Sequence, residues 1–249
     1  MKPLLFIPTY NEHENVERIY GMIKALNLDL DMLFLDDNSP DGTGQILDNI
    51  ATRDGRVSVI HRSGKLGIGS AHLDAIQRAY AKGYTVFISM DCDLTHSPDH
   101  LPQFLKYGDD FDVVLGSRFM RGDSLTEWNI LRKFLTYLGH FLTRRVLHVP
   151  YDATGAFRLY RLDRINPGVF KLVESPGYSF FFESLYVLCL SGVRVKEIPI
   201  SLPIRTHGQS KMRLSDVFAS MRRLIELYSR SFHYKNELRK LKQVEAANV

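Results

Sequence analysis

Short apolar runs alternate with segments of helical periodicity along the first half of the chain, and this alternation is the strongest constraint on its fold. The apolar runs cover residues 4–7, 32–35, 57–60, 86–90 and 113–118. After the first run, Val16, Ile19 and Ile23 recur at the spacing of an amphipathic helix, and the next runs are followed by similar segments. Such alternation is typical of an α/β fold whose mainly parallel sheet is covered by helices on both faces.

Length and composition fit an ordinary globular protein. The 249 residues suffice for one large α/β domain, with or without an appended helical segment. The net charge of +4 allows an anionic partner without identifying one. Cys92 and Cys189 form no C-x-x-C pair, which favours a reduced, cytoplasmic setting without disulfides or zinc. No run approaches the ~18 apolar residues that a membrane span requires.

Two carboxylates follow the fourth apolar run. Asp91 and Asp93 are two residues apart, so their side chains point to the same side of an extended segment. They lie at the carboxyl end of a strand, where open α/β sheets bind ligands. Carboxylate oxygens at such a place suit Mg²⁺ or Mn²⁺. The short pattern is also common in solvated turns, so by itself it leaves both interpretations open.

Polar residues follow other runs as well. Pro8 cannot donate to a sheet and is expected to end the first strand. Arg118 ends the fifth run, so it could reach the same edge of the sheet as Asp93. Residues 62–70 form a glycine-rich loop with two cations, which is either a phosphate-binding loop or a plain turn. Glu183, just before a buried apolar segment, is either a helix cap or a functional acid.

Two basic amphipathic helices are expected in the second half of the chain. Residues 130–147 carry apolar side chains at helical spacing with basic side chains between them, and the helix that begins near residue 214 repeats this pattern. Each helix either packs on the core or lies in a membrane interface. Basic side chains beside an apolar stripe attract anionic lipid by roughly 1 kcal/mol per charge. Residues 205–211 form a polar loop with cations at both ends.

Together these motifs resemble the family 2 glycosyltransferases, and among them the polyprenyl-phosphate (dolichyl-phosphate) mannose synthases. The resemblance runs from about residue 4 to residue 227. It rests on residues 8–12, 36–43, 67–70, 91–96, 116–118 and 205–211. It implies a GT-A catalytic domain over residues 1–212, followed by a C-terminal amphipathic helix and basic tail over residues 213–249.

The resemblance also assigns roles to individual residues. Asp91, Asp93 and Arg118 would be catalytic. The donor nucleotide would be bound by Pro8, Tyr10, Glu12, Leu35, Asp37, Asp91, Cys92 and Asp93. A divalent metal, Mg²⁺ or Mn²⁺, would be held by Asp91, Asp93 and Thr95, and the acceptor phosphate and leaving diphosphate by Arg118, Arg132, Arg205 and Lys211. Cys92 stands where the family usually has Ala, and Thr95 where it has Ser or Gln.

The implied activity is the inverting, metal-dependent transfer of a hexose to a polyprenyl or dolichyl monophosphate, with mannose from GDP-mannose as the first expectation. A phosphate monoester is largely dianionic at pH 7, so the acceptor requires no strong general base and positioning becomes the main catalytic task. Three alternatives stay open: a UDP-glucose-dependent transferase for the same lipid, a family 2 enzyme acting on soluble glycans or proteins, and a non-catalytic lipid-binding subunit.

The expected partners are a nucleotide-sugar donor, a lipid phosphate and a membrane surface, but not nucleic acid. Many bacterial relatives carry C-terminal membrane spans, and this sequence contains none. The protein is therefore expected at the cytoplasmic face of a membrane, peripherally bound, with a small membrane-anchoring subunit as a further partner.

Overall fold

The computed structural model describes residues 1–121, 124–125, 130–203 and 214–247, apart from the side chains of residues 131, 132, 214 and 247. The strands are β1 (Pro3–Thr9), β2 (Asp31–Asp36), β3 (Val57–His61), β4 (Val86–Ser89), β5 (Val113–Ser117), β6 (Arg158–Arg161) and β7 (Val195–Pro199). The helices are α1 (Val16–Ala25), α2 (Thr43–Arg53), α3 (Ile68–Ala81), α4 (Leu101–Gly108), α5 (Ile130–Val146), α6 (Pro167–Lys171), α7 (Phe180–Ser191), α8 (Leu214–Ser229) and α9 (Ser231–Ala247). A short 3₁₀ turn, Pro98–His100, precedes α4.

The strands form a seven-stranded sheet in the order β3-β2-β1-β4-β6-β5-β7. Every neighbouring pair is parallel except the two pairs that involve β6, which runs opposite to both β4 and β5. The expectation of a mainly parallel sheet is therefore confirmed. One edge of the sheet collects the carboxyl ends of the other six strands, and it also receives the amino end of β6.

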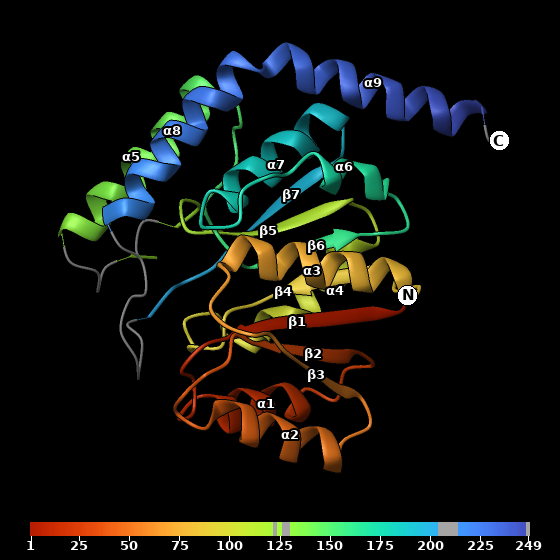
Figure 1. Cartoon of the computed structure of the whole chain (residues 1–249), viewed down its shortest axis with the longest axis vertical. Coiled ribbons are helices and arrows are strands. Elements are labelled where there is room, and N and C mark those ends of the chain that lie inside the picture. Colours follow the sequence, from red (N-terminus) through yellow and green to blue (C-terminus); the bar gives the residue numbers. More distant parts are fainter. Residues whose placement is uncertain (122–123, 126–129, 204–213, 248–249) are drawn as a thin grey trace.

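Helices cover both faces of this sheet, as expected. One core cluster joins the sheet to α1, α2 and α4, and the other joins it to α3, α6, α7, α8 and α9. Figure 1 shows α1 and α2 on one side of the strands, and α6, α7 and α9 on the other. In this view β1 runs from the N-terminus at the right toward the left, where α5 and α8 also lie. The carboxyl edge of the sheet thus faces the same side of the molecule as α5 and α8.

The first strand runs past Pro8, and the expectation that it ends there is wrong. Pro8 pairs with Leu35 of β2, and β1 continues to Thr9. The pairing of β1 with β4 ends earlier, at Phe6 opposite Ser89. At Pro8 the strand therefore has a neighbour on one side only, and a residue without an N–H is tolerated as it is at a sheet edge.

The two C-terminal helices share the core of the rest of the chain. Leu224 and Leu227 of α8, and Tyr234 and Leu238 of α9, belong to the same cluster as α3 and α7. The boundary at residue 212 stays a prediction. In the described part of the chain, no helix is both long enough and apolar enough to cross a membrane.

Candidate active site

The loops that follow β1, β2 and β4 converge at the carboxyl edge of the sheet. Each contains a residue in the left-handed conformation: Asn11 with φ 54°, Asn38 with φ 58° and Leu94 with φ 62°. Asparagine adopts this conformation with little difficulty, whereas for a residue as bulky as leucine it is unusual. Leu94 lies between Asp93 and Thr95, so the backbone is strained within the acidic motif itself. Such strain persists only where neighbouring contacts hold it.

Asp93 supplies the contacts that hold this turn. Its side chain is only 5% exposed. Its Oδ1 accepts a hydrogen bond from the Thr95 N–H at 3.1 Å and another from the Thr95 hydroxyl at 2.6 Å. The Asp91 N–H donates to Nδ1 of His96 at 3.0 Å, and the His96 ring stacks on Phe157. The motif is therefore a compact turn whose shape its own side chains set.

The donor set of this turn fits a hard divalent cation. Cys92 is buried in the core cluster on one side of the chain, while the Asp91 side chain keeps about a third of its surface exposed. Among the described residues no group of three or more His, Cys, Asp or Glu side chains is placed to hold a metal. Mg²⁺ needs no such group, because one or two carboxylates, waters and substrate phosphates complete its shell. The metal, and the role of Thr95 in holding it, stay predictions.

Arg118 reaches the same edge from the end of β5 and is gripped by Asp152. Its Nε and Nη2 donate to the two oxygens of the Asp152 carboxylate at 2.8 and 2.6 Å, and Nη2 also donates to the Thr154 hydroxyl. Both members of the pair are buried. Burial favours the neutral arginine, but the attraction of Asp152, its hydrogen bonds and the charge of Asp91 outweigh this and raise the pKa of Arg118. Arg118 after β5 and the acidic turn after β4 thus lie at the same edge of the sheet, and their joint role stays a prediction.

Asp152 is a residue that the sequence interpretation missed. Burial would raise its pKa, but the attraction of Arg118 and the hydrogen bonds that Arg118 donates hold the pKa of Asp152 below its ordinary value. Its backbone N–H donates to Glu197 of β7 at 2.7 Å. Burial raises the pKa of Glu197, and the charge of Asp152 adds to this effect, while the hydrogen bond from the Asp152 backbone opposes it. Asp152 precedes the antiparallel strand β6, so a search for residues that follow strands passes over it.

The predicted donor residues lie around the ends of β1 and β2. Asp37 is buried, and its Oδ1 accepts a hydrogen bond from Nε of Arg62 at 2.5 Å. Its neighbour Asp36 instead holds the loop, accepting from the backbone of Ser39 at 3.1 Å. The Lys65 ammonium lies 4.8 Å from the centre of the Tyr10 ring. The cations of the glycine-rich loop thus lie beside the predicted nucleotide site.

The other predicted site residues add little to the geometry of the site. Glu12 is half-buried and accepts from the Asn15 amide at 2.7 Å. Pro8 is half-buried, and the Leu35 side chain is buried in the core, so only the backbone of Leu35 can face a ligand. The side chain of Arg132 lies outside the described residues, as do Arg205 and Lys211 entirely. Their roles stay predictions.

Two of the three glycines of the 62–70 loop, Gly67 and Gly69, are explained by close backbone contact within the protein. A Cβ at Gly67 would lie 2.4 Å from the carbonyl oxygen of Pro176, and one at Gly69 would lie 2.4 Å from that of Ser175. Gly67 also has φ +102°, a conformation that favours glycine. These two positions must be glycine because the loop before α7 presses against them. The sequence shows the glycines but not the segment that they make room for.

Helices α5 and α8 pack together and expose apolar side chains on the outside of the molecule. The exposed residues on α5 are Ile130, Phe134, Tyr137 and Phe141, and those on α8 are Phe218, Met221, Ile225 and Tyr228. On each helix they recur at three- and four-residue spacing and so form one stripe. Other apolar residues of α8 face the core, so packing alone does not account for the outer stripe. We call these eight residues the α5–α8 face.

Comparison with known proteins identifies the class. The family model for "Glycosyl transferase family 2" matches residues 5–166, so the chain belongs to the family 2 glycosyltransferases. Its α/β architecture is the GT-A fold, as predicted.

Two curated relatives and one solved structure are similar over most of the chain. The "Undecaprenyl-phosphate mannosyltransferase" of Micrococcus luteus is 35% identical over 213 residues, 85% of this chain and 88% of that protein. The "Polyprenol monophosphomannose synthase" of Mycolicibacterium smegmatis is 34% identical over 228 residues, 90% of this chain and 86% of that protein. The mannosyltransferase PcManGT of Pyrobaculum calidifontis, solved with GDP-Man and Mn²⁺, has a TM-score of 0.51 at 14% identity, covering 99% of this chain and 75% of that one. This last likeness concerns the fold alone.

Proposed function

We propose that the protein transfers mannose from GDP-mannose to a polyprenyl monophosphate at the cytoplasmic face of a membrane, with inversion at the sugar carbon. The observation that carries this proposal is the carboxyl edge of the sheet, where the acidic turn after β4 and the buried Arg118 after β5 both lie. The names of the two curated relatives support mannose as the sugar and a polyprenyl phosphate as the acceptor.

The residues of the edge divide the chemical work between donor and acceptor. Asp37 and Tyr10 bind the nucleoside, and Asp91 and Asp93 hold a divalent cation at the diphosphate. When bound, that cation supplies positive charge that offsets the charge developing on the leaving diphosphate. Arg118 binds the acceptor phosphate through its planar guanidinium, which Asp152 keeps in one orientation. A dianionic phosphate oxygen then attacks the sugar carbon without a protein base.

The α5–α8 face supports a lipid acceptor. It lies on the side of the molecule toward which β1 points, so an acceptor embedded in a membrane can reach the carboxyl edge from there (Figure 1). Exposed apolar patches of this extent mark interaction sites. Basic residues of α5, Arg144 and Arg145 among them, are exposed and suit anionic lipid headgroups.

A donor panel tests the proposed reaction. The full chain is incubated with a short polyprenyl phosphate and either GDP-mannose or UDP-glucose, with Mg²⁺ or Mn²⁺ and with chelator. We expect GDP-mannose to be consumed, the lipid-linked sugar to appear, and chelator to stop both. Preferential use of UDP-glucose would replace the mannosyl proposal with the glucosyl alternative. Transfer to soluble glycans but not to the lipid would refute the acceptor, and nucleotide binding without transfer would point to the non-catalytic alternative.

Vesicle co-sedimentation tests the membrane surface. We expect the double variant Phe218→Ser/Ile225→Ser to bind anionic vesicles at least about tenfold more weakly than the native chain, because each inserted side chain contributes roughly 1.5–3 kcal/mol. Val244→Ser removes from α9 an apolar side chain as exposed as that of Ile225 and serves as the control. Equal binding by all three proteins would contradict the surface. Binding of the native chain to vesicles in the absence of any other protein would show that no anchoring subunit is required.

A further inference from the structure

A buried ion pair fastens α8 to the body of the protein. Glu183, in the first turn of α7, has no exposed surface, and its two oxygens accept hydrogen bonds from Nη2 and Nε of Arg223 at 2.6 and 3.1 Å. Burial favours the neutral arginine, but the hydrogen bond and charge of Glu183 outweigh it and raise the pKa of Arg223. Glu183 thus anchors α8, the helix that contributes half of the α5–α8 face.

The same carboxylate also holds the loop before α7. Its oxygens accept hydrogen bonds from the backbone N–H of Glu174 at 2.7 Å and of Ser175 at 3.1 Å, and from the Ser175 hydroxyl. One buried group therefore fixes both α8 and residues 174–177. A change in the position of α8 cannot leave this loop undisturbed.

That loop presses directly on the start of α3. The backbone N–H of Ser70 donates to the Pro176 carbonyl at 3.0 Å, and the carbonyls of Ser175 and Pro176 fill the space beside Gly69 and Gly67. There is no room for a side chain between the two segments. The position of the loop therefore sets the position of the glycine-rich turn.

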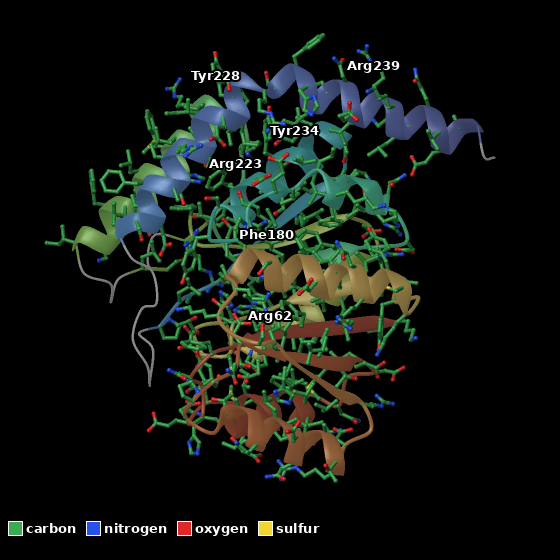
Figure 2. All side chains as sticks on the ribbon, viewed as in Figure 1. Arg62, Phe180, Arg223, Tyr228, Tyr234 and Arg239 are labelled. Carbon is green, nitrogen blue, oxygen red and sulfur yellow. The ribbon has the colours of Figure 1, made fainter. Side chains whose placement is uncertain are left out.

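The glycine-rich turn in turn holds the donor side of the site. Arg62 donates to the Ser70 hydroxyl at 2.7 Å and to the Gly67 carbonyl at 3.1 Å, while its Nε donates to Asp37 at 2.5 Å. Figure 2 shows Arg223, then Phe180 at the start of α7, then Arg62 one after another from the top of the molecule to its middle. A continuous series of direct contacts thus joins α8 to Asp37.

We propose that Arg223 is a positioning residue for the donor site: by clamping Glu183, it transmits the seating of α8 through the 174–177 loop to Arg62 and Asp37. Binding of the nucleotide sugar then depends on how firmly α8 is docked. The helix that meets the membrane is thereby coupled to the pocket that binds the soluble donor. This inference rests on the proposed use of Asp37 in donor binding.

The test removes the clamp without leaving a buried charge. The double variant Glu183→Gln/Arg223→Met loses both partners, and such paired replacements are tolerated far better than removal of one. Arg222→Met is the matched control, because Arg222 is the neighbouring arginine, is 84% exposed and pairs with Glu226 alone among the described residues. Binding of GDP-mannose and of GDP is measured by calorimetry well below the unfolding temperature, and vesicle binding is measured alongside.

We expect the double variant to bind GDP-mannose about tenfold more weakly, with the control unchanged. If the ion pair serves stability alone, the double variant would unfold at a lower temperature but bind GDP-mannose with an unchanged dissociation constant. That result would overturn the inference. If the double variant does not unfold cooperatively, Arg223→Lys is tested in its place. This variant keeps the charge but loses the two-point hydrogen bonding of the guanidinium. Unchanged affinity of this variant for GDP-mannose would also overturn the inference.

The outcomes also separate this inference from the proposed function. A native chain that binds no guanosine nucleotide sugar would refute the proposed donor and this inference together. A native chain that binds and transfers normally, with a double variant of equal affinity, would refute the coupling alone.

Discussion

Replacing Asp93 with asparagine is expected to reduce sugar transfer by roughly 10²- to 10⁴-fold while the fold survives. The substitution is chosen because the amide oxygen of asparagine can still accept the two hydrogen bonds from Thr95 that hold the turn. The negative charge is lost, and with it the attraction for a divalent cation at the diphosphate. The measurement is the rate of lipid-linked sugar formation at saturating donor and Mg²⁺ or Mn²⁺.

Two comparisons sharpen this experiment. Asp99→Asn removes an equal charge from an exposed residue just beyond the motif and is expected to leave transfer unchanged. Thermal unfolding of Asp93→Asn is expected to stay close to that of the native chain. Turnover near the native rate in Asp93→Asn would refute the metal role of this carboxylate, and with it the proposed mechanism.

Replacing Arg118 with methionine is expected to lower both stability and acceptor use. The substitution leaves Asp152 as a buried, uncompensated carboxylate, which typically costs about 3–5 kcal/mol. For a chain of this length, each kcal/mol lowers the unfolding temperature by about 2–4 °C. Loss of a charged hydrogen-bond donor to the acceptor phosphate lowers kcat/KM for the acceptor by roughly 10- to 100-fold.

The double variant Arg118→Met/Asp152→Asn separates these two effects. With no buried charge left unpaired, its unfolding temperature is expected to recover most of the loss, whereas acceptor use stays impaired. Calorimetric binding of GDP-mannose serves as the internal control, because Arg118 is assigned to the acceptor. If donor and acceptor are affected equally, or if the double variant regains acceptor use, Arg118 has no acceptor role.

Sequence reasoning places residues correctly at the carboxyl edge of the sheet when those residues directly follow a strand. Asp91 and Asp93 follow β4 and Arg118 follows β5, and parallel strands bring their carboxyl ends to one edge. The order of the strands is not needed for this conclusion. It is enough that apolar runs alternate with helices and end in charged residues.

The residues that sequence reasoning misses depend on contacts between distant segments. Asp152 reaches the edge because β6 runs backward, and a single short apolar run does not reveal the direction of its strand. Glu183 looks equally like a cap or a catalytic acid until its partner, forty residues further along, is known. Gly69 is explained only by the loop before α7 and by Phe180, the first residue of α7, which together fill the space beside it. In each case the deciding neighbour is set by tertiary packing, not by local periodicity.

The reversed strand β6 also bears on how such an enzyme can evolve. It separates β1 to β4, whose loops carry the proposed donor residues, from β5 and β7, which lead to Arg118 and α8. Residues near Arg118 that take no part in the contacts from α8 to Asp37 can therefore change while the proposed donor residues stay in place. Asp152 lies in the loop that leads into β6 and binds Arg118 where the two halves meet, so we expect few substitutions to be tolerated at this position.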